Sequence, residues 1–478
     1  MQSEPRSQPT RRLAVIGAGI TGLSAALRLS ERLPEAELAV FDASSRPGGV
    51  VRTACRDGYL IESSADSFIT SLPWAVQLCQ RLGLENRLIE TDATHRRAFV
   101  VRRGKLLPIP DGLMIMAPSR IGPLVTTPIL SPWGKLRMVA EAFVPKGAGQ
   151  DESLASFVRR RFGREAFDRL IQPLVGGMYT GDPERLSVQA TMPRFLEMEQ
   201  QHGSLIRALR RQATTRGAAG AGSGARYSLF VGLAGGLSEL VDALVRALPA
   251  GVIQLNTPVE RLARTGDGRW ELSFGEGRAP ACFEHVVIAA SVRQTQRLLE
   301  CVDPGLSANF ESVPSASSAI ASLGYLRETI RHPLDGFGFV VPRIERLPIL
   351  SGSFSSVKFP GRAPPGHVLI RVFLGGAARP DLLQCDDAAL VQTAHEELAR
   401  LLGINQAPVF SCVNRWNQAM PQYQVGHLEW VASVRSRLAQ WPGLELAGNA
   451  YEGVGVPQCI HSGEQAAERI AMICENRD

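Results

Sequence analysis

Three glycines near the N-terminus have the spacing of a turn that binds a dinucleotide. Gly17, Gly19 and Gly22 follow the apolar run LAVIG and precede a segment with a helical pattern. In such a turn the first glycine permits the sharp bend, the second lets a pyrophosphate approach the backbone, and the third lets the helix pack closely. N–H groups at the start of the helix then bind phosphate oxygens. The pattern predicts a nucleotide site.

An acidic residue follows at the distance that a nucleotide's ribose requires. Asp42 comes twenty residues after Gly22, at the end of a second apolar run, LAVF. A carboxylate at this point can accept hydrogen bonds from a ribose hydroxyl group. The alternative is that Asp42 only caps the turn that follows it. The spacing favours the ribose contact.

Short elements must position these residues. The pattern predicts a strand over 13–17, a helix over 21–33 and a strand over 38–41, which together form a βαβ unit. The last forty residues have the same character, with a strand (LELAG), a glycine-rich loop (NAYEGVGV) and a helix over 459–473. We infer that one nucleotide domain is assembled from separate parts of the chain.

The intervening chain is expected to contribute helices and a second sheet. Helical patterns cover 154–162 and 166–174, and we expect Pro173 with the glycines after it to end the second helix. Strand-like alternation dominates residues 310 to 436.

Two further motifs carry a family resemblance. Arg46 is followed by Gly48 and Gly49, and the loop from Gly448 to Gly455 precedes the last predicted helix. These segments resemble flavoproteins of the monoamine oxidase and phytoene desaturase superfamily. Arg46 can neutralise phosphate, and paired glycines let the chain pass beneath a cofactor. The resemblance implies noncovalent FAD, with the N-terminus of the last helix facing the flavin.

The resemblance also implies a set of cofactor-binding residues. They are Gly17, Ala18, Gly19, Ile20, Thr21, Gly22, Asp42, Ala43, Arg46, Gly48, Gly49, Ser64, Ala65, Asp66, Ser67, Val259, Trp416, Gly453, Val454, Gly455 and Val456. The loop that begins at Ser64 reads SADSF where the family has GPNSF. We therefore expect its backbone contacts to persist and assume nothing about its side chains.

Within the superfamily the sequence is most similar to the protoporphyrinogen IX oxidase family. The match runs from about residue 13 to 472 and includes GDPERLS from Gly181, GFGFVVP from Gly336, FSSVKFP from Phe354 and WNQAMPQY from Trp416. It implies a six-electron oxidation of protoporphyrinogen IX to protoporphyrin IX in heme biosynthesis, in three flavin turnovers with O₂ as acceptor and hydrogen peroxide as product. No Ser/His/Asp set, metal cluster or paired carboxylates stand out, which suits a flavin enzyme.

A substrate pocket follows from the same resemblance. Gly177 is expected to turn its backbone carbonyl toward the pyrrole N–H groups, and the other lining residues are Phe337, Gly338, Val340, Ser353 and Phe373. The family's propionate-binding arginine has no direct counterpart, because Ala98 stands at its position. Arg96 and Arg97 are the candidates instead, and strand alternation would send them to opposite faces.

Other activities remain open at this point. Oxidation of coproporphyrinogen III to coproporphyrin III uses the same chemistry on a substrate with four propionates. An amine oxidase or carotenoid desaturase is a further alternative. A carrier without flavin is the alternative from another class, and the intact Arg46, Gly48 and Gly49 argue against it.

Composition narrows the class of protein. The 478 residues carry 52 Lys plus Arg and 46 Asp plus Glu, and only four of the cations are lysines. No long basic run indicates nucleic-acid binding. The eight cysteines show no C-x-x-C pair, so neither a metal site nor a disulfide framework is expected, and a reducing compartment is the default. The apolar run at 13–29 belongs to the glycine turn rather than to a signal peptide.

A mixed α/β fold is predicted, with a discontinuous Rossmann-like FAD-binding domain, a β-sheet substrate domain and an inserted helical domain. The boundaries are 1–75, 226–300 and 438–478 for the first, 76–93 and 301–437 for the second, 94–212 for the third and 213–225 for a flexible linker.

The segment 108–134 is apolar, broken by prolines and flanked by basic residues. It packs either in a core or against a membrane. The expected location is therefore the cytoplasm, peripherally attached to the inner face of the cell membrane. A ferrochelatase is a conceivable partner for transfer of the product.

Overall fold

A parallel sheet of five strands holds the N-terminal turn. The computed structural model describes residues 11–215, 230–275, 277–377 and 379–476. The strands run in the order β12 (Ile253–Gln254), β2 (Glu37–Phe41), β1 (Arg12–Ile16), β16 (His285–Ile288) and β22 (Leu444–Leu446), and every neighbouring pair is parallel. The sheet thus draws its strands from the beginning, the middle and the end of the chain.

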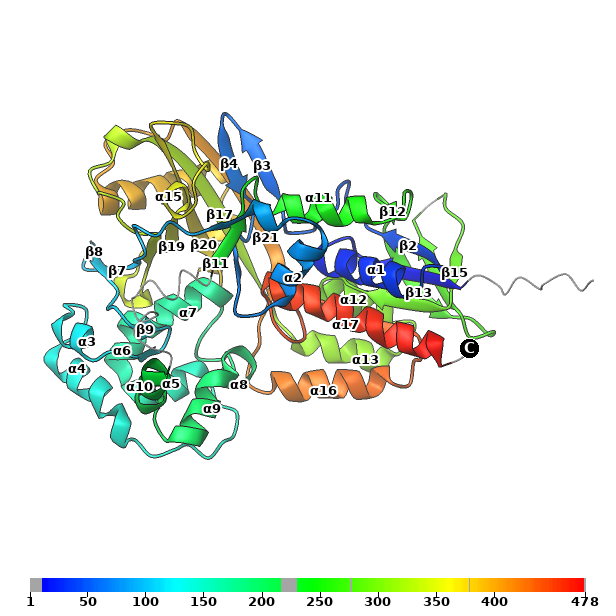
Figure 1. The fold of residues 1–478 in the computed structure, drawn as a ribbon, viewed down its shortest axis with the longest axis horizontal. Helices are drawn as coiled ribbons and strands as arrows, with labels where there is room; N and C mark the ends of the chain where they lie inside the picture. The colour runs from blue at the N-terminus through cyan, green and yellow to red at the C-terminus, as the bar shows by residue number, and fades with distance from the viewer. Residues whose placement is uncertain (1–10, 216–229, 276, 378, 477–478) are drawn as a thin grey trace, which may run out of the picture.

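Both faces of this sheet are covered, as a parallel sheet requires. Leu13 and Val15 of β1 point into a core with helices α1 (Ile20–Arg32), α11 (Ser238–Ala247) and α17 (Val456–Glu475). Ala14 and Ile16 point into a second core on the opposite face. That face is covered by the elements β13 (Val259–Arg264), β14 (Trp270–Phe274), β15 (Ala281–Phe283), α12 (Val292–Leu299), α13 (Pro304–Asn309) and α16 (His427–Leu438). Figure 1 shows them around the sheet at the right of the molecule.

A second sheet has seven strands. Their order is β21 (Phe410–Pro421), β17 (Ser315–Leu326), β20 (His367–Gly375), β19 (Ile349–Phe354), β18 (Gly338–Val340), β7 (Phe99–Arg102) and β8 (Lys105–Pro108), and only β18 and β7 pair in parallel. Helix α15 (Asp387–Leu402) covers one face, on which Phe339, Val372 and Leu374 are buried. The other face is turned toward the rest of the molecule.

Small sheets and helices join the two large sheets. A hairpin consists of β3 (Thr53–Arg56) and β4 (Tyr59–Glu62), and a three-stranded sheet has the order β5 (Phe68–Ile69), β11 (Phe230–Leu233), β6 (Leu88–Glu90). Helices α2 (Trp74–Arg81) and α14 (Ser355–Lys358) lie near these strands in the chain.

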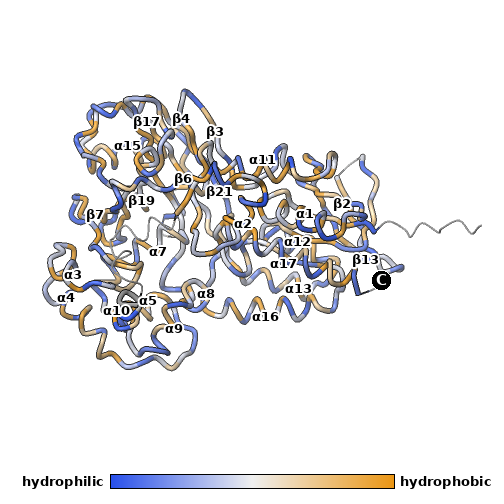
Figure 2. Tube along the Cα trace, viewed as in Figure 1, coloured by the Kyte–Doolittle hydropathy of each residue, from blue (hydrophilic) through white to orange (hydrophobic). Residues whose placement is uncertain are grey.

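A lobe of short helices lies beneath the seven-stranded sheet in Figure 1. Its elements are β9 (Leu113–Met114), β10 (Ala117–Pro118), α3 (Gly122–Thr126), α4 (Pro132–Val139), α5 (Leu154–Phe162), α6 (Arg164–Ala166), α7 (Gln172–Tyr179), α8 (Val188–Thr191), α9 (Pro193–His202) and α10 (Leu205–Thr215). Arg161, in the core of the lobe, pairs with the buried carboxylates of Glu141 and Glu199. In Figure 2 the outer helices carry both hydrophobic and hydrophilic residues, as expected for helices that bury one face.

The apolar segment 108–134 contributes mainly to the core of this lobe. Met116, Leu124, Ile129 and Leu130 are buried there. Val125 and Trp133 of the segment are exposed, as are two apolar residues that follow it, Leu136 and Phe143. Among the described residues, no helix combines the length and the hydropathy needed to cross a bilayer. Peripheral membrane attachment therefore stays a prediction that concerns the exposed residues only.

Two local expectations need correction. Pro173 and the following glycines do not end a helix, because α7 begins after a π-helical turn at Phe167–Ile171 and continues to Tyr179. Pro173 lies in the first turn of α7, where its missing N–H is tolerated. The predicted linker begins inside a helix, since residues 213–215 end α10, and the rest of it lies outside the described residues.

Candidate active site

Two of the fingerprint glycines are required by the packing of the protein itself. Gly17 has a φ of +109°, and a Cβ there would overlap the backbone oxygen of Ala289 at the end of β16. A Cβ at Gly22 would overlap the carbonyl oxygen of Gly17. Helix α1 therefore starts directly against the turn, as the fingerprint predicted.

Gly19 is different, because nothing in the protein occupies the space of its missing side chain. The nearest atom to a Cβ at Gly19 would be the Cα of Gly49, at 4.0 Å. Gly48 bridges to Gly19 as a short parallel pair, and its N–H donates to Ala18 O at 2.8 Å. The two glycine segments thus face each other with backbone only. This passage fits a dinucleotide pyrophosphate, which must approach the chain closely.

Helix α1 offers its N-terminus to this passage. Gly19 is the N-cap, no side chain caps the helix, and its first turn contains no acidic residue. Its first N–H groups lack helical partners, and the helix dipole favours an anion at this end. Phosphate oxygens would satisfy both.

Asp42 lies at the end of β2, as predicted, and organises the loops around it. Its carboxylate accepts hydrogen bonds from Ala18 N at 2.6 Å and Ser44 N at 2.7 Å. Its backbone oxygen accepts one from Thr257 N, which brings the start of β13 and Val259 to the same side. A carboxylate has further acceptor positions. Asp42 and the start of β13 with Val259 thus lie together, and their contact with the adenosine part of FAD stays a prediction.

The predicted arginine supports the second glycine turn. Arg46 donates to Pro47 O at 3.1 Å and to Gly49 O at 2.9 Å. Burial and the neighbouring charge of Arg52 lower its pKa. Sequence reasoning missed Arg52, although its position three residues after Gly49 was a usable signal. The two guanidinium groups concentrate positive charge beside the passage.

A second helix N-terminus points to the site from the C-terminal part of the chain. Gly455 is the N-cap of α17, which also has no side-chain cap and no acidic residue in its first turn. The loop before it is held by Tyr423, whose hydroxyl donates to Asn449 O at 2.7 Å and accepts from Gly453 N at 2.8 Å. Burial raises the pKa of Tyr423, so the hydroxyl keeps its proton. The predicted residues Gly453 to Val456 are thus held by Tyr423, the last residue of the motif WNQAMPQY, to which the sequence analysis gave no role of its own.

The loop from Ser64 to Ser67 joins the nucleotide site to the seven-stranded sheet. Ser64 Oγ donates to Val50 O at 2.7 Å, next to the second glycine turn, and Trp416 Nε1 of β21 donates to Ser63 O at 2.7 Å. Asp66 pairs with Lys358 at 2.8 Å and with Arg371 of β20 at 3.4 Å. Burial alone would raise the pKa of Asp66, but the charges of Lys358 and Arg371 outweigh it and hold that pKa well below its usual range. Asp66, which belongs to the segment that departs from the family pattern, therefore pairs with Lys358 and Arg371.

The face of the seven-stranded sheet opposite α15 carries most of the predicted substrate residues. Register places Val340 beside Ser351 and Ser351 beside Phe373, while Ser353 lies between Gly338 and Arg371. Alternation along the strands puts these side chains on the face opposite α15. Phe337 precedes β18 and is buried, and its N–H donates to Arg97 O at 2.8 Å.

Gly177 lies directly across from this face. It belongs to the last turn of α7, where backbone oxygens lack the usual helical partner. A Cβ there would have ordinary contacts of 3.9 Å with Ser351 Oγ and Val340 Cγ1. Packing therefore does not demand a glycine at this position, and the contact of Gly177 with a substrate stays a prediction.

Two clefts open between the helical lobe and the sheet. One of about 370 Å³ is lined by Gly176 and Gly177 together with Arg343, Arg346 and Arg379. Arg343 pairs with Asp182 at 2.8 Å, whereas the side chain of Arg346 has no hydrogen bond or ion pair within the described part of the chain. Sequence reasoning missed these arginines because Arg343 and Arg346 lie in one short turn and Arg379 in a distant loop, and no local pattern links the two segments.

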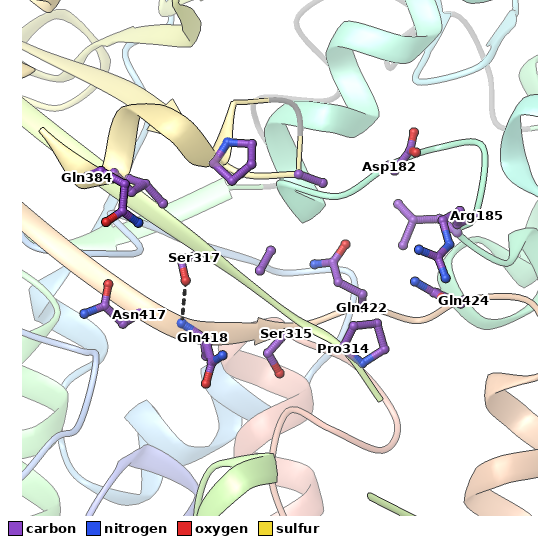
Figure 3. Close-up of a pocket in the computed structure, with 16 residues that line it drawn as sticks. Asp182, Arg185, Pro314, Ser315, Ser317, Gln384, Asn417, Gln418, Gln422 and Gln424 are labelled. Atoms are coloured by element: carbon purple, nitrogen blue, oxygen red, sulfur yellow. Dashed lines mark hydrogen bonds between the residues drawn. The ribbon is translucent and has the colours of Figure 1, made fainter. Parts of the chain in front are cut away.

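The other cleft, of about 450 Å³, has a different lining. Figure 3 shows the amide side chains of Asn417, Gln418, Gln422 and Gln424 around it, with Arg185 and Asp182 at one end. It adjoins the first cleft at Asp182 and Ala377. Amides offer neutral hydrogen bonds, so the positive charge is concentrated in the first cleft.

The two predicted propionate-binding arginines lie just before β7, which begins at Phe99. The expectation that strand alternation separates them was therefore wrong, because neither lies in a strand. Arg97 pairs with Asp335 at 3.1 Å and is half exposed, while Arg96 lies 3.9 Å from Glu90. Arg96 and Arg97 are absent from the lining of both clefts described above. Their role stays a prediction.

Comparison with known proteins agrees with this geometry. A family model described as flavin containing amine oxidoreductase matches residues 20–471. The chain is 33% identical over 466 residues to coproporphyrinogen III oxidase of Bacillus subtilis (strain 168), covering 96% of this chain and 98% of that protein. It is 30% identical over 482 residues to the chloroplastic protoporphyrinogen oxidase of Nicotiana tabacum, covering 95% and 84%.

A solved structure gives the same answer. A crystal structure from Exiguobacterium sp. 255-15, assigned as a protoporphyrinogen oxidase, superposes with a TM-score of 0.86 at 29% identity, covering 98% of this chain and 100% of that one. The predicted family resemblance, the mixed α/β fold and FAD as the cofactor are thereby confirmed. The chain belongs to the flavin containing amine oxidoreductase family and, within it, to the FAD-dependent porphyrinogen oxidases.

Proposed function

We propose that the chain oxidises coproporphyrinogen III to coproporphyrin III. The observation that carries this proposal is the arginine-lined cleft beside Gly177. Arg343, Arg346 and Arg379 line it; Arg343 pairs with Asp182 and Arg379 with Asp381, which leaves Arg346 as the guanidinium group without a carboxylate partner among the described residues. Guanidinium groups bind carboxylates through paired, charge-assisted hydrogen bonds. A substrate with four propionates needs such groups on more than one side, whereas protoporphyrinogen IX has only two.

The names of similar proteins support the same substrate. Relatives from Bacillus subtilis, Staphylococcus aureus and Propionibacterium freudenreichii, at 33%, 32% and 35% identity, are named coproporphyrinogen III oxidase.

Bound FAD would accept two electrons from the macrocycle in each turnover and pass them to O₂. Over three turnovers the substrate loses six electrons and six protons, and three O₂ become three H₂O₂. The residues of the chain supply position rather than acid or base catalysis. Gly177 leaves room for the macrocycle and offers a carbonyl to its pyrrole N–H groups, while Phe373 and Val340 give the ring an apolar surface.

Protoporphyrinogen IX is the second candidate, and one observation favours it. Beside Phe373 and Val340, the sheet face also carries Ile320, opposite Phe373 in the register. Such an apolar surface would suit vinyl groups. The relative from Nicotiana tabacum, which is named protoporphyrinogen oxidase, is 30% identical.

An aerobic fluorescence assay with both porphyrinogens tests the proposal, because each product fluoresces and each substrate is colourless. We expect a kcat/KM at least tenfold higher for coproporphyrinogen III. Arg346→Ala should raise KM for this substrate by about 10-fold, the lower end of a charge-assisted bond of 1.5 to 3 kcal/mol, with kcat nearly unchanged. Arg293→Ala, an exposed arginine of α12, is the control. A preference for protoporphyrinogen IX, with KM indifferent to Arg346, would reverse the assignment.

A further inference from the structure

A buried cluster of charges lies where the loop from Ser64 to Ser67 meets the seven-stranded sheet. Lys358 Nζ donates to Asp66 Oδ1 at 2.8 Å and to Ser67 Oγ at 2.9 Å. Arg371 lies 3.4 Å from the other carboxylate oxygen of Asp66 and also donates to Ser64 O. The side chains of Asp66 and Lys358 are 14% exposed and that of Arg371 is 2% exposed. Lys358 is one of only four lysines in the chain.

The cluster carries more positive than negative charge. Two cations face one carboxylate, and the depressed pKa of Asp66 keeps that carboxylate ionised. Arg362 and Glu62, both buried, carry further charges beside the cluster, and Glu239, which also acts on Arg362, is already paired with Arg87. Even with Glu62 ionised, one positive charge remains uncompensated. An excess charge in a buried place is costly unless an anion offsets it.

Polar atoms without partners mark the side of the cluster that is incomplete. Arg371 Nε is buried and has no hydrogen-bond partner among the described residues. The same holds for Ser322 Oγ, on the residue that faces Arg371 in the next strand. Buried polar groups are usually paired. Arg371 and Ser322 lie on the sheet face that carries Ser353 and Phe373, so the unpaired atoms belong to the face turned toward the site.

The position of the cluster relates it to one end of the dinucleotide. Asp42 and Val259 are the predicted contacts of the adenosine, and the passage between Gly19 and Gly49 fits the pyrophosphate. Continuing away from Asp42, the chain reaches Val50, which binds Ser64, two residues before Asp66. FAD bound with its pyrophosphate in this passage and its adenosine at Asp42 would extend its flavin in this direction. The excess positive charge therefore lies on the flavin side.

We propose that Lys358 and Arg371, oriented by Asp66, are positioning residues that stabilise the negative charge of reduced FAD. Uptake of two electrons and one proton converts FAD to the anion FADH⁻, with the electrons supplied by the porphyrinogen and returned to O₂. A fixed positive charge nearby favours that anion because the surroundings are buried and weakly screening. The inference rests on FAD binding and not on which porphyrinogen is the substrate.

Two measurements on purified holoprotein test this without any substrate. One is the two-electron midpoint potential of the bound FAD, and the other is the dissociation constant for sulfite, which adds to oxidised flavin and bleaches its absorbance as an anionic adduct. Lys358→Met should weaken sulfite binding by about 10-fold and shift the reduction equilibrium by the same factor, which is about 30 mV for a two-electron couple. Asp66→Asn should move both quantities in the opposite direction. Lys358→Arg should leave both near the values of the unaltered protein.

The opposite signs separate electrostatics from disruption of the fold. Lys105→Met, an exposed lysine of β8, is the control for loss of a lysine. If Lys358→Met and Asp66→Asn shift the potential in the same direction, or if neither moves it, the proposal is wrong. A change confined to KM for porphyrinogens would assign the cluster to the substrate and also overturn it. Should Lys358→Met lose its flavin, Asp66→Asn and Lys358→Arg still decide the matter.

Discussion

Gly463 of α17 lies so close to Thr21 of α1 that a Cβ atom at Gly463 would overlap the backbone oxygen of Thr21. The last helix of the chain is thus seated on the first turn of the helix that follows the glycine fingerprint. Both helices present uncapped N-termini to the cofactor site. Their close contact fixes the distance between the two ends at which FAD would be held.

Replacing Gly463 by leucine should separate these helices. The side chain cannot occupy the space of a backbone atom, so α17 must shift away from α1, and we expect Tm to fall by several degrees together with the flavin content. Thermal unfolding and the absorbance at 450 nm measure the two effects. Gly266→Ala is the control, because a Cβ there meets nothing within 4 Å. Equal behaviour of the two variants would contradict the packing argument.

Gly19 and Gly22 should respond differently to valine. At Gly22 the side chain overlaps the carbonyl of Gly17, so Gly22→Val should destabilise the apoprotein. At Gly19 the protein leaves the space open, so Gly19→Val should fold and yet be colourless, since the branched side chain occupies the approach of the pyrophosphate. The Tm of the apoproteins and their FAD dissociation constants distinguish these results. Stoichiometric flavin in Gly19→Val would remove the site from this turn.

The fold of the nucleotide site could be read from local patterns. The unit from β1 to β2 is formed by residues that are neighbours in the chain, so the spacing of its apolar residues predicts it. The helix predicted over 154–162 is observed as α5. Asp66 and Lys358 are 292 residues apart in the chain, and no local pattern links such a pair. The continuation of α7 through Pro173 depended on a π-helical turn that composition does not reveal. The arginines of the cleft beside Gly177 were missed because they too are far from Gly177 along the chain.

Arg96 and Arg97 remain candidates for binding a propionate, and each should be replaced by alanine separately. The backbone oxygen of Arg97 accepts a hydrogen bond from Phe337, which directly precedes β18. We therefore expect Arg97→Ala to raise KM more than Arg96→Ala does. A lost charge-assisted bond of roughly 1.5 to 3 kcal/mol would raise KM by about 10- to 100-fold with a smaller change in kcat. Steady-state kinetics with both porphyrinogens measure this. An unchanged KM in both variants would leave carboxylate recognition to the cleft beside Gly177.

Exposed apolar residues at the outer end of the helical lobe should mediate peripheral membrane binding. Trp133 is 79% and Phe143 83% exposed, and Lys135 lies between them in the chain. A basic residue near an anionic surface contributes about 1 kcal/mol. We expect Trp133→Asp to reduce cosedimentation with anionic vesicles at low salt, while Val409→Asp, an exposed apolar residue next to β21, has no effect. Absence of vesicle binding by the unaltered protein would end this prediction, and with it the route by which a membrane-bound ferrochelatase would receive the product.

Stability should fall as the pH drops below neutrality, in part because of His427. Its ring stacks on Tyr423 with centroids 3.9 Å apart and lies 3.3 Å from Tyr451 O. Burial lowers the pKa of His427, and the nearby carbonyl groups and Asp151 oppose this only partly. The folded state therefore binds its proton at a lower pH than the unfolded state, whose histidines titrate near 6.5.

The sign of the effect follows from proton uptake. Below about pH 6.5 the unfolded state gains a proton that the folded state refuses, so the free energy of unfolding decreases by up to about 1.4 kcal/mol per pH unit for each such group. The loss stops once the pH falls below the folded pKa. His332 and His461, whose pKa values burial also lowers, add to the slope. His427→Asn should thus reduce the difference in stability between pH 5.5 and 7.5 without abolishing it.

Urea denaturation at these two pH values, with FAD in excess, measures that difference. Tyr423→Phe is the matched control, because it removes the hydroxyl that holds Gly453 and leaves the titrating ring in place. It should cost about 1 kcal/mol at both pH values. An unchanged slope in His427→Asn would show that this ring does not titrate differently in the two states, and the contact with Tyr423 would then be packing alone.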